Sequence, residues 1–156
     1  MRKIEFFDTS GTLDNKFLKS LEKTWVFKLP KAYREFLLKY NGGKPSSNCF
    51  SFSEDKTDGS VIQSFFGIHG MDNYDLLYEY QNVYKDRIPA NCFPIACDSF
   101  GNLILISVKG SDRGKIYFWD HEEEAYEDEE PDYSNLTLIA DSFDEFLDGL
   151  HDYEEE

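Results

Sequence analysis

The sequence predicts an α+β fold, in which helices pack on one face or end of a mainly antiparallel sheet. Two patterns lead to this fold class. Apolar residues recur at helical spacing near both ends of the chain, and they alternate with period two between residues 93 and 119. The chain has 156 residues, 17% of them aromatic, which is enough for one hydrophobic core. We therefore expect a single domain over residues 1–156.

Two helices are expected in the N-terminal third of the chain. Residues 14–24 place their apolar side chains on one helical face. Pro30 suits the first position of a second helix, because its fixed φ fits there and its missing N–H would be unpaired anyway. The buried stripe of this second helix consists of Tyr33, Phe36, Leu37 and Tyr40. Asn41, Gly42 and Gly43 should end the helix, since Asn and Gly tolerate the left-handed conformation of a C-cap.

The middle of the chain is expected to pass from short strands into a third helix. Phe50 and Phe52 alternate with serines, as in a half-buried strand, and residues 61–68 form an apolar, β-branched segment that predicts a second strand. Asp72 is predicted to cap the third helix. The buried face of that helix would carry Leu76, Leu77, Tyr80 and Tyr84.

From residue 93 onward the pattern predicts an antiparallel meander. Strands are expected at residues 93–97, 103–108 and 115–119, joined by Gly-containing turns at 99–102 and 109–114. The strand at 103–108 is apolar apart from Ser107, which favours a central position covered on both faces. A further strand at 136–140 precedes a last helix, where Ser142 and Glu145 have the spacing of a capping box.

The excess of negative over positive charge lies entirely in the C-terminal quarter. The formal net charge is −15, but the first 119 residues hold 14 acidic and 16 basic side chains. The last 37 residues hold 17 acidic side chains and no Lys or Arg, which defines an acidic loop at 120–132 and a short acidic tail at 152–156. Such a chain is a poor ligand for nucleic acid and for anionic membranes, because both repel acidic surfaces. A partner with a basic surface is favoured.

Neither a signal peptide nor a long apolar run is visible, so we expect a cytoplasmic protein. The three cysteines, Cys49, Cys92 and Cys97, form an odd set without CxxC spacing, which favours reduced thiols in the core. The three histidines are scattered and lack metal-ligand spacing, so no metal and no cofactor are expected.

Catalytic motifs are not found either, and we expect no enzyme. The chain contains no nucleophile elbow and no Gly-rich phosphate loop. Asp98, beside Gly101 and Asn102, is a carboxylate placed at a strand end, where a hydrolase could use it. A role in forming the turn is the favoured alternative, since Asp, Gly and Asn are preferred turn residues.

The acidic loop has two interpretations. It is either a solvated segment that keeps the protein soluble or an electrostatic recognition surface for a basic partner. For the second interpretation, Trp119 would be an aromatic contact beside the loop, although its strand could equally present a second buried face. The predicted partner-binding residues are Glu122, Glu123, Glu124, Glu127, Asp128, Glu129, Glu130 and Trp119.

An ordered set of short motifs resembles the signature of the SMI1/KNR4 family, also called the SUKH superfamily. The first motif is Leu29, Pro30, Tyr33, Phe36, Leu37, Asn41, Gly42 and Gly43. The later motifs are Phe66-Gly67-Ile68, Ile88-Pro89, Pro94-Ile95-Ala96 with Asp98, Gly101 and Asn102, residues 115–122, and Ser142-Phe143 with Phe146-Leu147. The resemblance extends over residues 18–150.

This resemblance implies an α+β domain without known enzymatic activity. Bacterial members are regarded largely as immunity proteins, which neutralise polymorphic toxins that are often nucleases. Fungal relatives are linked to the regulation of cell-wall synthesis through protein–protein contacts. The resemblance therefore implies an immunity protein that binds a cognate toxin, and a regulatory or scaffold protein is the alternative.

Overall fold

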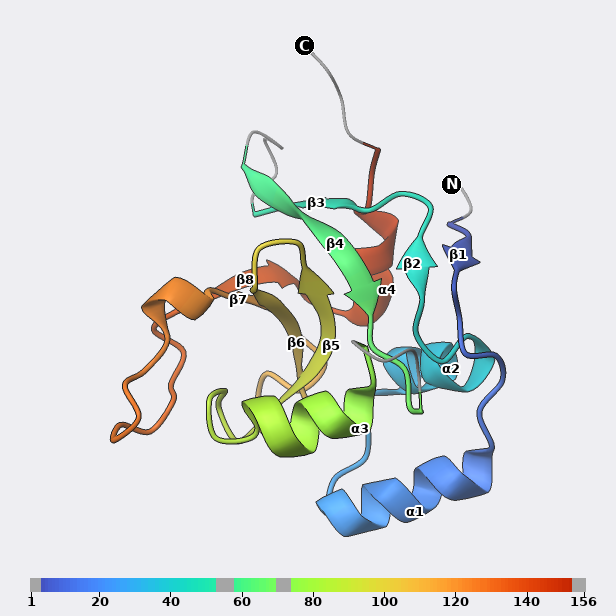
Figure 1. Cartoon of the computed structure of the whole chain (residues 1–156), viewed down its shortest axis with the longest axis horizontal. Helices are drawn as coiled ribbons and strands as arrows, with labels where there is room; N and C mark the ends of the chain where they lie inside the picture. The colour runs from blue at the N-terminus through green and yellow to red at the C-terminus, as the bar shows by residue number, and fades with distance from the viewer. Residues whose placement is uncertain (1–3, 53–57, 70–73, 153–156) are drawn as a thin grey trace.

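A six-stranded antiparallel sheet forms the centre of the computed structural model, which describes residues 4–52, 58–69 and 74–152 (Figure 1). Its strands lie side by side in chain order, so each one pairs with the next. They are β3 (Cys49–Ser51), β4 (Gly59–Phe65), β5 (Cys92–Asp98), β6 (Leu103–Ser107), β7 (Ile116–Trp119) and β8 (Leu136–Ala140). A separate antiparallel pair joins β1 (Phe6–Phe7) to β2 (Lys44–Pro45). The predicted meander is confirmed.

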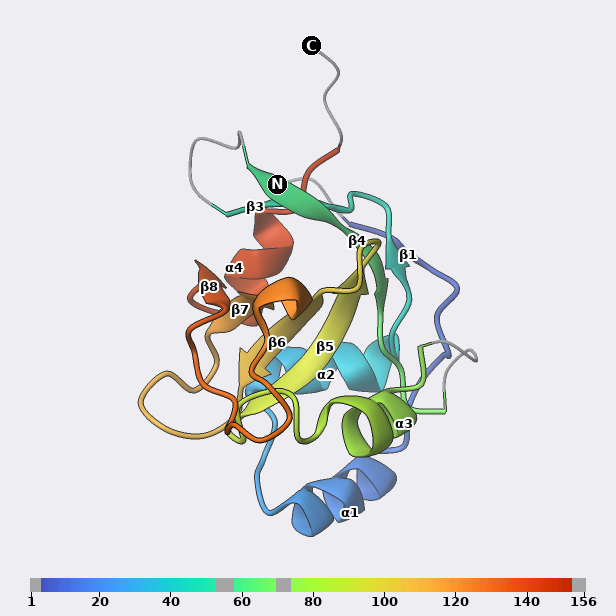
Figure 2. The ribbon, with the colours of Figure 1, turned by 60° about the vertical axis from the view of Figure 1, so that its left-hand side comes forward.

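The helices lie behind the sheet and at one end of it (Figures 1 and 2). They are α1 (Asn15–Trp25), α2 (Lys31–Lys39), α3 (Leu76–Tyr78) and α4 (Phe143–Asp148). A π-helical segment, Glu79–Tyr84, continues α3. In both views α1 and α3 lie at the same end of the sheet, whereas α2 and α4 lie behind the strands. This arrangement confirms the predicted α+β fold class.

Helix starts agree with the sequence pattern in two cases and differ in two. The Ser142 hydroxyl accepts a hydrogen bond from the Glu145 N–H at 3.1 Å, and Asp14 caps α1 in the same way. Pro30 is the residue before α2 and not its first helical residue. The cap of α3 is Asp75, which accepts from the Leu77 N–H at 3.2 Å. Asp72, the predicted cap, lies outside the described residues.

The central strands β5, β6 and β7 are buried on both faces, and every residue of β6 is buried, whereas the edge strand β8 is partly exposed. On one face, Phe118 of β7 packs against Phe52 with ring centroids 4.7 Å apart. On the other face, Trp119 lies edge-to-face against Tyr84 of the π-helical segment at 5.8 Å. Aromatic side chains from α2 and α4 also meet, with the rings of Phe36 and Phe143 5.3 Å apart. Burial of both faces explains why β6 is apolar apart from Ser107, whose buried hydroxyl is hydrogen-bonded to Asp112.

The segment after α2 packs against the segment after β4 through a buried amide. Asn41, at φ 52°, donates from Nδ2 to the Ile68 carbonyl at 2.8 Å and accepts from the Ile68 N–H at Oδ1, 2.7 Å away. The two backbones approach so closely that a Cβ on Gly67 would lie 2.1 Å from the Asn41 carbonyl oxygen. Asn41 and Gly67 therefore join two distant parts of the chain.

The thiols of the chain are predicted to be unreactive in the native state. Burial raises the pKa of Cys92 and of Cys97 to about 11, and it also raises the pKa of Cys49. At pH 8 only about 0.1% of a thiol with that pKa is the reactive thiolate. We expect a disulfide exchange reagent to label the native protein at least a hundredfold more slowly than the urea-unfolded protein. Rapid labelling of any of the three thiols in the native protein would contradict this.

Candidate protein-binding site

The acidic connection between β7 and β8 is closed at its base by two hydrogen bonds between Asp120 and Asn135. The Asp120 N–H donates to the Asn135 carbonyl at 3.1 Å, and Asn135 Nδ2 donates back to the Asp120 carbonyl at 2.9 Å. A short 3₁₀ turn, His121–Glu123, begins at Asp120, whose carboxylate accepts from the Glu122 N–H. In Figure 2 this connection, drawn in orange, lies in front of the sheet.

Glu124 holds the first half of the acidic connection against the body of the protein. Its two carboxylate oxygens accept hydrogen bonds from Nε and Nη2 of Arg87 at 3.0 and 2.8 Å. The Arg87 guanidinium also lies over the rings of Tyr84 and Trp119, with centroid distances of 4.9 and 5.6 Å. A two-point contact of this kind fixes orientation as well as distance. Glu124 is therefore an anchor, and its carboxylate is half-buried.

Tyr133 holds the second half of the connection. Its hydroxyl donates to Asp112 Oδ2 at 2.6 Å and accepts a hydrogen bond from Asn91. Asp112, in the turn between β6 and β7, also accepts from the hydroxyls of Tyr117 at 2.8 Å and Ser107 at 2.7 Å. Three hydroxyl groups thus converge on one carboxylate and fix the return of the acidic connection to β8.

The Asp112 carboxylate is expected to stabilise the fold at neutral pH and not in acid. Burial alone would raise its pKa, but hydrogen bonds from Tyr133, Ser107 and Tyr117 outweigh burial and hold the pKa below its usual range. A carboxyl group with a lower pKa in the folded state contributes stability above its unfolded pKa. That contribution disappears as the pH falls through the folded value.

The matching experiment compares Asp112→Asn with the native chain across pH. At pH 7 we expect the substitution to lower the free energy of unfolding by about 1–3 kcal/mol, since three donors lose a charged acceptor. The free energies of unfolding of the variant and of the native chain should begin to converge below about pH 4, as the pH falls through the lowered pKa of Asp112. Asp128→Asn, at an exposed carboxylate, is the control and should have no effect at either pH. A constant difference between Asp112→Asn and the native chain down to pH 2 would contradict the role given to Asp112.

The tip of the connection is where carboxylates face solvent together. Glu124 apart, all of the predicted acidic contacts are exposed: Glu122, Glu123, Glu127, Asp128, Glu129 and Glu130. Tyr126 is 78% exposed among them. Sequence reasoning did not select Tyr126, although its place inside the acidic run was the available signal. An exposed Tyr surrounded by carboxylates combines apolar contact area with a negative field, which suits a basic protein surface.

The prediction that Trp119 contacts a partner is wrong. Its side chain is completely buried, with 0% exposure. Tyr84 and the Arg87 guanidinium cover the face of β7 on which Trp119 lies. The alternative interpretation, a second buried face, is the correct one. Trp119 contributes indirectly, because the Arg87 guanidinium that binds Glu124 lies over its ring.

Asp98 organises the turn between β5 and β6. Its Oδ1 accepts from the N–H groups of Phe100 and Asn102, both at 2.8 Å. Its Oδ2 accepts from the Ser60 hydroxyl and from Asn102 Nδ2, both at 2.9 Å. The carboxylate is buried and its oxygens are occupied by four donors, which is the turn-forming role predicted for it.

Neither a metal cluster nor a membrane-spanning helix is found among the described residues. Within 4–52, 58–69 and 74–152, His, Cys, Asp and Glu side chains nowhere gather in a group of three or more that could hold a metal ion. None of the helices in these ranges is long and apolar enough to cross a membrane.

Comparison with known proteins identifies the family. The family model described as SMI1 / KNR4 family (SUKH-1) matches residues 12–149, from just before α1 to just after α4. The chain is also similar to the SPbeta prophage-derived uncharacterized protein YokK of Bacillus subtilis (strain 168). The two sequences are 34% identical over 158 residues, which cover 88% of this chain and 74% of the relative. The chain therefore belongs to the SMI1/KNR4 family (SUKH-1).

Proposed function

We propose that this protein is a cytoplasmic immunity protein that binds a cognate toxin through the acidic connection between β7 and β8 and blocks it without catalysing a reaction. Membership of the SMI1/KNR4 family supports a role of this type. The observation that carries the proposal is the anchored connection itself. Glu124 and Tyr133 fix it on both sides, while the carboxylates between them remain exposed.

Anchoring favours the recognition interpretation over that of a merely solvated loop. A free acidic segment loses conformational entropy when a partner orders it, and this loss weakens binding. Here the ion pair to Arg87 and the hydrogen bond to Asp112 have already restricted the connection before any partner arrives. Its exposed carboxylates are therefore presented as a preformed surface.

The charge of that surface selects the chemistry of the partner. Carboxylates gathered at one site create a negative potential that attracts cationic surfaces and accelerates association. A toxin that cleaves nucleic acid carries a basic cleft for phosphate, because the phosphate backbone dominates such binding. An acidic connection of this kind would occupy such a cleft and exclude the nucleic acid. We therefore infer a toxin with a basic surface as the partner.

The direct test begins with the genomic neighbourhood, where the proposal expects a toxin gene next to the gene for this protein, and uses the product of that neighbouring gene as the probe. Co-expression should restore growth that the toxin alone abolishes. With purified proteins, inhibition should be complete at one molecule of this protein per toxin and should not progress with time below that ratio. Inhibition that advances with time at a tenfold excess of toxin would indicate catalysis. Unchanged toxicity in both assays would refute the immunity function.

A further inference from the structure

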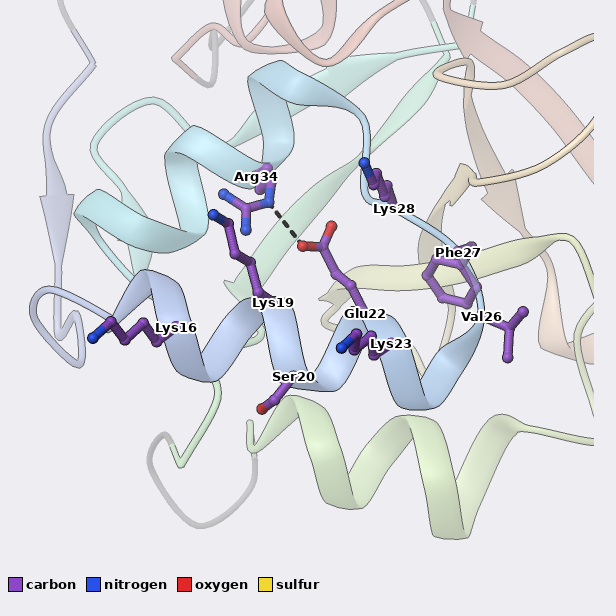
Figure 3. Close-up of a pocket in the computed structure, with 9 residues that line it drawn as sticks. All are labelled: Lys16, Lys19, Ser20, Glu22, Lys23, Val26, Phe27, Lys28 and Arg34. Atoms are coloured by element: carbon purple, nitrogen blue, oxygen red, sulfur yellow. Dashed lines mark hydrogen bonds and ion pairs between the residues drawn. The ribbon is translucent and has the colours of Figure 1, made fainter.

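A second charged region, opposite in sign, lines a groove between α1 and α2. The groove has a volume of about 840 Å³, within the range of ligand-binding clefts. Figure 3 shows that α1, the connection to α2, and α2 itself all contribute to its walls. The lining residues are Lys16, Lys19, Ser20, Glu22, Lys23, Val26, Phe27, Lys28 and Arg34.

Positive charge predominates in this groove. Five of the nine lining side chains are Lys or Arg, and Glu22 is the one acidic residue among them. The first 45 residues of the chain hold 10 basic and 5 acidic side chains, so the local excess contrasts with the net −15 of the chain. Lys109 and Arg113 extend the basic region at one end. The Lys109 ammonium lies 5.7 Å from the centroid of the Phe27 ring, and Arg113 donates to the Lys28 carbonyl at 2.7 Å.

Arg34 is held in a fixed orientation in the groove. Its Nε donates to Glu22 Oε1 at 2.9 Å, and the other oxygen of Glu22 accepts from the Leu29 N–H at 2.8 Å. Glu22 is 7% exposed, so this pair is fixed by burial as well as by hydrogen bonds. Within the described part of the chain, the two Nη groups of Arg34 have no hydrogen-bond partner. An oriented guanidinium with free Nη donors is suited to bind a carboxylate at two points.

Val26 supplies an apolar contact at the edge of the groove in an unfavourable backbone conformation. It ends α1 with φ 64°, in the left-handed region that a β-branched residue rarely adopts. Its side chain is nevertheless 78% exposed, so packing within the chain does not compensate for the strain. Glycine or asparagine would satisfy the backbone better at this position. Strained residues of this kind concentrate at functional sites, which indicates that the exposed Val26 serves an external contact.

We propose that this groove binds a short acidic peptide segment of another protein, with an apolar side chain against Val26 and Phe27 and carboxylates on the basic rim and on Arg34. Long polyanions fit less well. Arg113 contacts Lys28, and the adjacent Asp112 contacts Tyr133, so the groove and the acidic connection adjoin the same turn. A nucleic acid that extended beyond the groove would meet those carboxylates, whereas a peptide of a few residues would not.

The test measures peptide binding by the intact protein and does not depend on any toxin. The probe is a labelled nine-residue peptide library with Leu, Phe or Trp at one central position and Asp or Glu at half of the others. We expect fluorescence polarisation to detect micromolar binding at 0.15 M salt, and a library with Lys in place of the acidic residues should not bind. The Lys19→Glu, Lys23→Glu, Lys28→Glu triple variant should bind the acidic peptides at least about tenfold more weakly. The matched control reverses Lys31, Lys39 and Lys85, which lie outside the groove lining and should not affect binding.

Val26→Asn separates a binding role from a structural one. Asn is better tolerated in the left-handed region, so the melting temperature should stay constant or rise while peptide affinity falls at least about threefold. Several results would overturn the proposal: no acidic peptide binds, the control variant loses as much affinity as the groove variant, or Val26→Asn leaves affinity intact. Tighter binding of a 20-base-pair DNA duplex or of phosphatidylserine vesicles would also overturn it. So would salt-sensitive self-association that the groove variant abolishes, because the occupant would then be a second copy of this chain.

Discussion

Replacement of Gly67 by Ala is expected to lower the free energy of unfolding by about 3 kcal/mol or more. The new Cβ would lie 2.1 Å from the Asn41 carbonyl oxygen, and a backbone atom cannot rotate away as a side chain can. The segments after α2 and β4 would have to separate. That movement would break the two buried hydrogen bonds between Asn41 and Ile68. Urea unfolding of the native and variant proteins measures the effect.

Gly149→Ala is the matched control for this substitution. A Cβ on Gly149 would meet no atom closer than 3.5 Å, so the free energy of unfolding should change by less than about 0.5 kcal/mol. Asn41→Ala should destabilise the protein by removing the same hydrogen bonds. Because both changes disrupt one contact, their effects should be less than additive. Full additivity, or equal effects at Gly67 and Gly149, would contradict the role of this contact.

Reversal of the charges at the tip of the acidic connection is expected to slow association with the proposed toxin partner by about 10- to 100-fold. The variant changes Glu127, Asp128, Glu129 and Glu130 to Lys. These side chains are exposed and lie outside the two anchoring contacts, so the fold should persist. The association rate should also lose most of its dependence on salt concentration, because electrostatic attraction no longer contributes. Stopped-flow measurements at several salt concentrations give both quantities.

The control variant carries the same change in net charge at other places. It replaces Glu5, Glu35, Asp86 and Asp148, all exposed, by Lys. If the position of the charge matters, this control should slow association by less than about threefold. Equal slowing in both variants would show that net charge alone governs association, and the acidic connection would lose its special role.

Local sequence patterns predicted the elements of the fold because each pattern reports on one element. The alternation from Phe93 and the apolar run of β6 depend only on residues within those strands, and both predicted strands are found. The Asn-Gly-Gly stop after α2 is likewise local. Even so, the sequence did not indicate that Asn41 packs against Ile68, since that contact joins residues 27 positions apart.

The candidate site was predictable in composition but not in geometry. The excess of carboxylates was visible by counting, whereas the contacts of Glu124 with Arg87 and of Tyr133 with Asp112 span 37 and 21 positions. Trp119 was misplaced for the same reason. Alternation along β7 separates two faces, but only the folded chain shows that Tyr84 of the π-helical segment covers the Trp119 ring. The groove between α1 and α2 is lined by residues of both helices and of their connection, so no single sequence motif indicates it.

Carboxyl labelling of the protein alone and in complex with the proposed toxin partner tests the central claim most directly. A carbodiimide with glycine ethyl ester modifies accessible carboxylates, and mass spectrometry locates the products. We expect labelling at Glu127, Asp128, Glu129 and Glu130 to fall at least about fivefold in the complex, since a contact surface excludes the reagent. Labelling at Glu35 and Asp148 should not change. Equal labelling of the four tip residues with and without the toxin would contradict recognition through the acidic connection.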